Sequence, residues 1–168
     1  MTTQRVKPLV RFIAPLLLVC AYSSSVLADP QECAIALFDY ADNYPIEKLG
    51  AKIDIKLTQE PNLHGKPGSV INIRTYSSEG NMIMERECDT CWPEKFRIVS
   101  SVPAAQTLPC GLGKGSNLSQ ITKVLGQPYQ TQDNKMFTYY GDETGSRDVS
   151  VHLKNGRLTS VTSYQNME

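Results

Sequence analysis

The sequence predicts an α+β fold in which about two helices pack on an antiparallel β-sheet of six to seven strands. Two observations predict it. Short segments of alternating apolar and polar residues are separated by turn-forming residues, and each half of the chain also holds one segment with helical spacing of apolar residues. The halves meet near residues 102–105 without a low-complexity linker. We therefore expect a single domain over residues 29–168, with a first lobe at about 29–105 and a second at about 106–168.

The first 28 residues have the order of a secretory signal peptide. Three basic residues precede the apolar run at 12–21, and small residues lead to Ala28. A run of about ten residues is too short to span a bilayer, which needs ~20. An uncleaved anchor is the alternative, and a lipoprotein signal at Cys20 is a poor match because Val19 precedes it. We expect cleavage before Asp29, export to the periplasm, and at most peripheral contact with a membrane.

The net charge of the exported chain disfavours some classes of binding partner. Removal of the signal leaves 140 of the 168 residues, with 14 basic and 17 acidic side chains and a formal charge of −3. This length is enough to bury the core of one domain. No Lys/Arg run remains, so nucleic acid and acidic membrane surfaces are poor candidate partners.

The first lobe is predicted to be one helix followed by four strands. Ala34, Leu37, Phe38 and Ala41 have helical spacing, and Pro45 ends the helix. Two Pro and two Gly indicate a loop at 61–68. Alternation of apolar and polar residues predicts the strands, at 52–57, 70–76, 82–87 and 95–102.

The second lobe is predicted to be one helix followed by three strands, at 136–140, 149–153 and 158–164. Asn117 and Gln120 form a capping-box pattern at the start of the helix. Gly126 suits a left-handed helix stop, whereas Gly113 is interpreted as ordinary loop. The Asn155-Gly156 dipeptide predicts a tight type I′ hairpin between the last two strands.

Several motifs of the second lobe occur together in a known order. They are Gly115-Ser116-Asn117 before the helix, Ile121 within it, Leu125-Gly126-Gln127-Pro128 at its end, Tyr139-Tyr140 in the next strand and Lys154-Asn155-Gly156-Arg157-Leu158 at the hairpin. Residues 111–164 thereby resemble the BamE/SmpA and β-lactamase-inhibitor-protein (BLIP) group. The resemblance implies a small extracytoplasmic α+β domain that binds other proteins and does not catalyse. It suggests either a role in envelope assembly or an inhibitor or immunity protein for a secreted hydrolase.

Four cysteines remain in the exported chain: Cys33, Cys88, Cys91 and Cys110. An even number of cysteines in an exported domain indicates two disulfides. Three connectivities are possible, and the sequence does not choose among them. The pairing that we favour joins Cys88 to Cys91 across a tight turn and Cys33 to Cys110 across most of the first lobe.

The Cys88-x-x-Cys91 pair also supports an alternative function, a periplasmic thiol–disulfide oxidoreductase. Redox pairs of this kind are activated by a helix N-terminus, but the flanking sequence here predicts strand, turn and strand. A structural disulfide is therefore favoured. Zinc requires four Cys or His ligands at suitable spacing, and His64 and His152 are distant in sequence. We expect no metal and no cofactor.

No enzyme is predicted. The sequence contains no nucleophile motif, and Gly111–Gly115 lacks the spacing of a phosphate-binding loop. Four carboxylates could be paired in space: Asp54, Glu60, Glu85 and Glu87. Alternation instead places Asp54, Glu85 and Glu87 on solvated strand faces, and a solvated face is the interpretation that we favour. The candidate contact residues for another protein are aromatic, because such side chains supply large contact area at low entropic cost; they are Trp92, Tyr129, Tyr139 and Tyr140.

Overall fold

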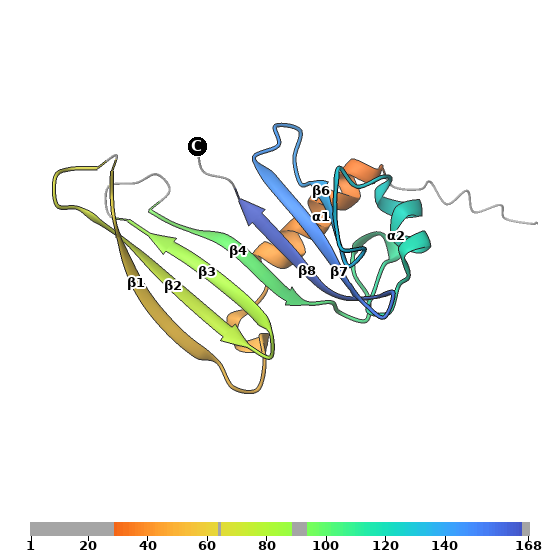
Figure 1. Cartoon of the computed structure of the whole chain (residues 1–168), viewed down its shortest axis with the longest axis horizontal. Coiled ribbons are helices and arrows are strands. Elements are labelled where there is room, and N and C mark those ends of the chain that lie inside the picture. Colours follow the sequence, from red (N-terminus) through yellow and green to blue (C-terminus); the bar gives the residue numbers. More distant parts are fainter. Residues whose placement is uncertain (1–28, 64, 89–93, 166–168) are drawn as a thin grey trace, which may run out of the picture.

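The computed structural model describes residues 29–63, 65–88 and 94–165, and these residues form two layers (Figure 1). One layer is a β-sheet and the other contains the helices. The elements in chain order are α1 (Pro30–Asp42), η1 (Ile46–Lys48), β1 (Asp54–Pro61), β2 (Val70–Ser78), β3 (Asn81–Glu87), β4 (Lys95–Pro103), η2 (Pro109–Gly111), α2 (Leu118–Leu125), β5 (Gln130–Gln132), β6 (Met136–Tyr140), β7 (Arg147–Lys154) and β8 (Arg157–Gln165).

Eight strands form one antiparallel sheet in the order β1-β2-β3-β4-β8-β7-β6-β5. Each lobe contributes four strands, and β4 joins the lobes by pairing with β8, with Val102 opposite Val161. The predicted α+β class is confirmed. The prediction of six to seven strands missed β5, which is only three residues long and wholly exposed. Its sequence, Gln-Thr-Gln, carries no alternation of hydrophobicity that could have revealed it.

Helix α1 begins earlier than its apolar spacing indicates, because its start depends on capping. The Asp29 carboxylate accepts a hydrogen bond of 2.9 Å from the backbone N–H of Gln31, and Pro30 occupies the first turn, where no N–H is needed. The helix contacts β4, β6, β7 and β8 (Figure 1). Leu37 and Phe38 are 0% and 2% exposed there. The helix of the first lobe thus covers strands of the second.

Helix α2 has both predicted ends. The capping box is present, since Asn117 and Gln120 exchange two hydrogen bonds of 2.9 Å between side chain and backbone. Gly126 has φ 73° and ψ −153°, a conformation reserved for glycine. The interpretation of Gly113 as ordinary loop is wrong: a Cβ on this residue would collide with the backbone carbonyl oxygen of Gln106.

A polar cluster within the first lobe joins the C-terminal end of α1 to strands β3 and β4. Arg97 on β4 donates hydrogen bonds to the carbonyl oxygens of Asp42 and Tyr44. Its guanidinium also lies 3.6 Å from Glu85 on β3, and Lys95 lies 3.1 Å from the same carboxylate. Glu85 is only 8% exposed, so its expected place on a solvated face is wrong. Two cations and the Tyr76 hydroxyl compensate its burial.

Candidate functional site

Three of the four aromatic residues predicted to contact a partner lie together. Tyr129, Tyr139 and Tyr140 border one cavity of about 150 Å³, which we call the tyrosine pocket. The fourth, Trp92, lies outside the described residues. Helix α1, the end of α2 and strand β6 build the rest of the pocket, with Pro30, Gln31, Ala34, Leu125 and Gln127. Residues from both lobes therefore form it.

The mouth of the pocket carries a stacked pair of tyrosines. The rings of Tyr129 and Tyr140 lie 4.2 Å apart between centroids at 13°, and the side chains are 44% and 49% exposed. Burial and the neighbouring Asp148 carboxylate raise the pKa of Tyr129. Gln31 donates a hydrogen bond of 3.3 Å to the carbonyl oxygen of Tyr140. These contacts hold two large aromatic surfaces in place before any partner arrives.

Tyr139 has the opposite environment from its neighbour Tyr140. Successive strand residues face opposite sides of a sheet, and Tyr139 is only 4% exposed. Burial raises the pKa of its hydroxyl to about 12. This hydroxyl has no hydrogen-bond partner among the described residues. A buried hydroxyl without a partner costs free energy, so an acceptor supplied from outside would be favourable here.

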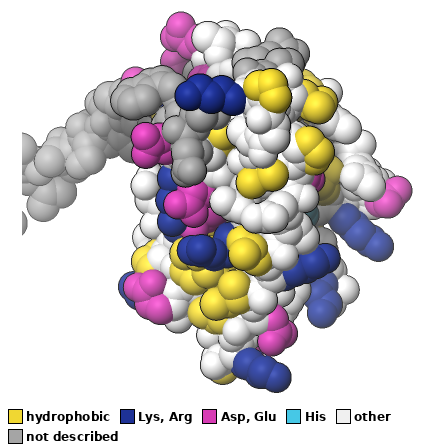
Figure 2. All heavy atoms as spheres, turned by 90° about the vertical axis from the view of Figure 1, so that its left-hand side faces the viewer, with side chains coloured by type: hydrophobic (Ala, Val, Ile, Leu, Met, Phe, Trp, Pro, Cys, Tyr) yellow, Lys and Arg dark blue, Asp and Glu magenta, His cyan; other side chains and the backbone are white. Residues whose placement is uncertain are grey.

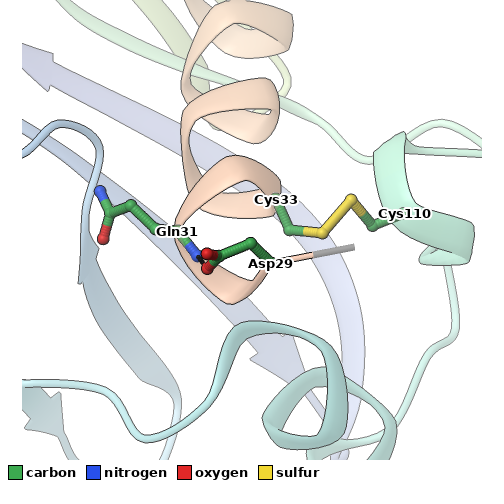
Figure 3. The surroundings of a disulfide bond; sticks show 4 residues. All are labelled: Asp29, Gln31, Cys33 and Cys110. Atoms are coloured by element: carbon green, nitrogen blue, oxygen red, sulfur yellow. Dashed lines mark hydrogen bonds between the residues drawn. A yellow bond between two sulfur atoms is a disulfide. The ribbon is translucent and has the colours of Figure 1, made fainter. Parts of the chain in front are cut away.

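The Cys33–Cys110 disulfide predicted from the sequence is present. Figure 3 shows the side chain of Cys33 leaving α1 towards Cys110, while Gln31 points to the other side of the helix. The two Cα atoms are 5.9 Å apart, and the bond spans 77 residues of sequence. A loop of this length gives stabilisation on the order of 4 kcal/mol in the chain-entropy model. The bond fixes the α1 end that borders the tyrosine pocket.

Cys88 is disulfide-bonded as well, and Cys91, its predicted partner, lies outside the described residues. Cys88 is 2% exposed, and the Asn62 amide lies 3.3 Å from its sulfur. Its backbone N–H donates to the Glu94 carbonyl oxygen at 2.8 Å, which joins the ends of β3 and β4. The described residues on both sides are thus strands. A helix N-terminus of the kind that activates redox cysteines does not occur among them.

A second hollow lies on the sheet face opposite the helices, and the sequence did not predict it. This outer groove, of about 320 Å³, is lined by side chains of the first lobe and the end of β8, among them Ile71, Ile73, Phe96, Ile98 and Tyr164. Arg86 lies over the Phe96 ring at 5.4 Å from its centroid. Alternation of Ile71 and Ile73 with polar neighbours was the available signal. It identified one face of the strand, but not that this face has no helix above it.

The His, Cys, Asp and Glu side chains in the described part of the chain do not assemble a metal centre. No group of three His, Cys, Asp or Glu residues there is arranged to hold a metal ion. His152 lies on the outer face and shares a hydrogen bond of 2.8 Å with Thr162; burial lowers its pKa. His64 lies outside the described residues. Within the described ranges, neither α1 nor α2 has the length and hydropathy needed to cross a membrane.

Comparison of the chain with protein-family models, curated proteins and solved structures finds no match in any of the three. The tyrosine pocket must therefore be interpreted from its own geometry. It combines a stacked, exposed aromatic pair, a small cavity and a buried hydrogen-bond donor.

Proposed function

We propose that this protein is a non-catalytic binding protein of the periplasm that engages another protein at the tyrosine pocket. The observation that carries the proposal is the convergence of the stacked Tyr129–Tyr140 pair with the unpartnered hydroxyl of Tyr139. The signal-peptide pattern of residues 1–28 supports export. The resemblance of the second lobe to BamE/SmpA and BLIP domains supports a protein as the partner.

The stacked pair supplies the contact area of a binding hot spot. Such sites are enriched in tyrosine, and they gain affinity when side chains are already ordered in the free protein. The Tyr129 ring is already stacked on Tyr140 in the free protein. Little side-chain entropy is left to lose when a partner covers these rings.

The cavity behind the pair supplies specificity. With its pKa raised to about 12, the Tyr139 hydroxyl keeps its proton at neutral pH and can donate it to an oxygen acceptor. The side-chain amides of Gln31 and Gln127 add polar groups to the lining. The partner residue that enters is therefore expected to carry a carbonyl or carboxylate oxygen on a short side chain.

Two roles fit this mode of binding, an accessory role in envelope assembly and an inhibitor or immunity role against a secreted hydrolase. They differ in the partner, which affinity capture from periplasm followed by mass spectrometry would identify. Recovery of envelope-assembly components supports the first role. Recovery of a hydrolase that loses activity on binding, especially one encoded by a neighbouring gene, supports the second.

Alanine at Tyr129 or Tyr140 should weaken binding to the captured partner by about 2 kcal/mol, roughly thirtyfold. Tyr139→Phe should weaken it by about tenfold, since only one hydrogen bond is lost. Tyr164→Ala is the matched control, because Tyr164 is 43% exposed but lines the outer groove instead. Loss of binding in the Tyr164 variant alone, with all variants folded by circular dichroism, would move the site to the outer groove.

The oxidoreductase alternative is tested separately. A double substitution of Cys88 and Cys91 by Ser should lower stability and leave binding intact in the folded fraction. If the parent protein catalyses disulfide exchange and this folded double variant does not, the oxidoreductase function replaces the one proposed here.

A further inference from the structure

The two edges of the sheet differ in how they are protected against pairing with another strand. Natural sheets protect their edges with short strands, charges, proline or covering elements. Strand β5, at one edge, has three polar residues. Strand β1, at the other, has eight, and its Ile55 and Leu57 are 66% and 59% exposed. Figure 1 places β1 at the end of the sheet away from α2, and Figure 2 shows exposed hydrophobic side chains beside basic ones at that end.

The free backbone groups of β1 can be assigned from one hydrogen bond. The N–H of Asn62 donates to the carbonyl oxygen of Ser69 at 3.0 Å, in direct continuation of the regular β1–β2 register. In an antiparallel ladder the residues that bond a given neighbour alternate. The even-numbered residues of β1 therefore bond β2, and the N–H and C=O groups of Ile55, Leu57 and Gln59 face outward. Pro61, which has no N–H, lies on the same free side, as expected for an edge.

We propose that β1 pairs antiparallel with β1 of a second copy of this chain, around a twofold axis at Thr58. In this register Leu57 pairs with Gln59 of the second copy, and all four outward N–H and C=O groups of that pair are used. Lys56 comes opposite Glu60 of the second copy, and the symmetry repeats this ion pair. Thr58 meets its own counterpart, a favourable cross-strand pair.

Among the registers that overlap most of β1, the charges favour this one, and they also favour a second copy as the occupant. Because the outward N–H and C=O groups belong to odd-numbered residues, the two β1 strands can pair only in registers that place odd-numbered residues opposite each other. A twofold axis at Leu57 would bring Asp54 against Glu60, and an axis at Lys56 would bring two lysines together. An axis at Gln59 would leave both Lys56 and Glu60 without an opposite charge. A second copy centred on Thr58 supplies the complementary charge for both residues.

Apolar contacts add to the pairing on one face. Ile55 would lie opposite Pro61 of the second copy, and the two Leu57 side chains would be diagonal neighbours near the axis. Diagonal neighbours remain within reach of long side chains. The pairing would thus cover the two most exposed aliphatic side chains of β1 and join two eight-stranded sheets into one. This assembly is independent of binding at the tyrosine pocket.

The test uses the purified protein in analytical ultracentrifugation, with Lys56→Glu and Glu60→Lys variants. The parent should dimerise, and each variant alone should dimerise about thirtyfold more weakly, ~2 kcal/mol, because two attractive cross-strand pairs become repulsive. Mixing the two variants should restore dimers, since each charge then faces its opposite. Lys135→Glu, an exposed lysine elsewhere, is the matched control and should dimerise like the parent.

A second variant separates loss of pairing from loss of folding. Gln59→Pro removes an N–H that faces away from β2, so the monomer should keep its urea midpoint while dimerisation weakens by at least about tenfold. A parent protein that is monomeric at millimolar concentration overturns the proposal. A dimer that the charge variants and Gln59→Pro leave unchanged overturns it equally.

Discussion

Strands β1 and β7 have the same length and the same antiparallel pairing, yet their burial is opposite. In β7, Val149 and Val151 are 0% exposed and alternate with half-exposed residues. In β1 no residue is buried, and seven of its eight residues are exposed. Strand β7 lies between two strands and is covered by α1, whereas β1 is an edge without a helix above it. Alternation in the sequence specifies a strand, but a covering layer decides whether its apolar side becomes core.

The two parts of the sheet therefore differ in how much of their apolar surface is buried. The part under α1 contains most of the fully buried side chains, and the disulfide and α2 reinforce it. The strands farther from α1 keep apolar side chains at the surface, in the outer groove and along β1. The free energy of unfolding should therefore depend mainly on contacts under the helix, and four measurements test this expectation.

The largest effect is expected for Phe38→Ala compared with Leu57→Ala. Phe38, a buried residue of α1, is 2% exposed, so its truncation leaves a cavity and should cost about 3–5 kcal/mol. Leu57, on β1, should change the free energy of unfolding by less than about 0.5 kcal/mol. Urea denaturation at a concentration where the protein is monomeric measures both. Equal losses would mean that β1 is as tightly packed as the covered strands.

Arg97 connects the two regions, and its removal should rank second. Arg97→Gln deletes charge-assisted hydrogen bonds to α1 and one partner of the buried Glu85, at a cost of about 2 kcal/mol. Lys95→Gln is the control, because Lys95 pairs with the same carboxylate but is 52% exposed and should cost less than about 1 kcal/mol. Thermal unfolding of both variants compares them. A greater loss for Lys95→Gln would contradict the role given to Arg97.

Gly113 and Gly126 test two different reasons for glycine in the second lobe. Gly113→Val would force the side chain against the Gln106 carbonyl, and Gly126→Val would strain a positive φ. Each should cost about 1–3 kcal/mol, with Gly113 at least equal to Gly126. Gly68, in the loop after β1, has φ 83° and no atom within 4 Å of the position that a Cβ would take. Gly68→Val therefore measures the cost of the positive φ without a steric clash. If Gly113→Val unfolds at the same urea concentration as the parent protein, Gly113 is an ordinary loop residue after all.

The smallest effect concerns His152 on the uncovered face of β7. Burial lowers its folded-state pKa, so the folded protein takes up this proton less readily than the unfolded chain. The contribution of neutral His152 to the free energy of unfolding is therefore fully present above the ordinary histidine pKa of about 6.5. It is lost as the pH falls below this value. His152→Gln should flatten the decline in unfolding free energy between neutral and mildly acidic pH. If the slope of unfolding free energy against pH is unchanged in this variant, groups other than His152 cause the pH dependence.

Much of the tyrosine pocket was accessible from the sequence, but its shape was not. Aromatic character identified Tyr129, Tyr139 and Tyr140, and strand alternation places neighbouring residues on opposite faces. Neither observation says which face lies under α1. Pro30 and Gln31 were missed because they lie about a hundred residues away in sequence, and only the packing of α1 against the sheet brings them to the pocket.

Local sequence patterns were sufficient to predict most of the secondary structure and its caps. Seven strands, both helices, the capping box and the positive φ angles of Asn155 and Gly156 at the last hairpin follow from interactions within a few residues. Three features follow from long-range packing instead: β4 pairs with β8, the first helix covers the second lobe, and Glu85 is buried. These outcomes depend on which surfaces meet after the chain has folded back over many residues. No local pattern encodes that choice, because the residues that meet are far apart in the sequence.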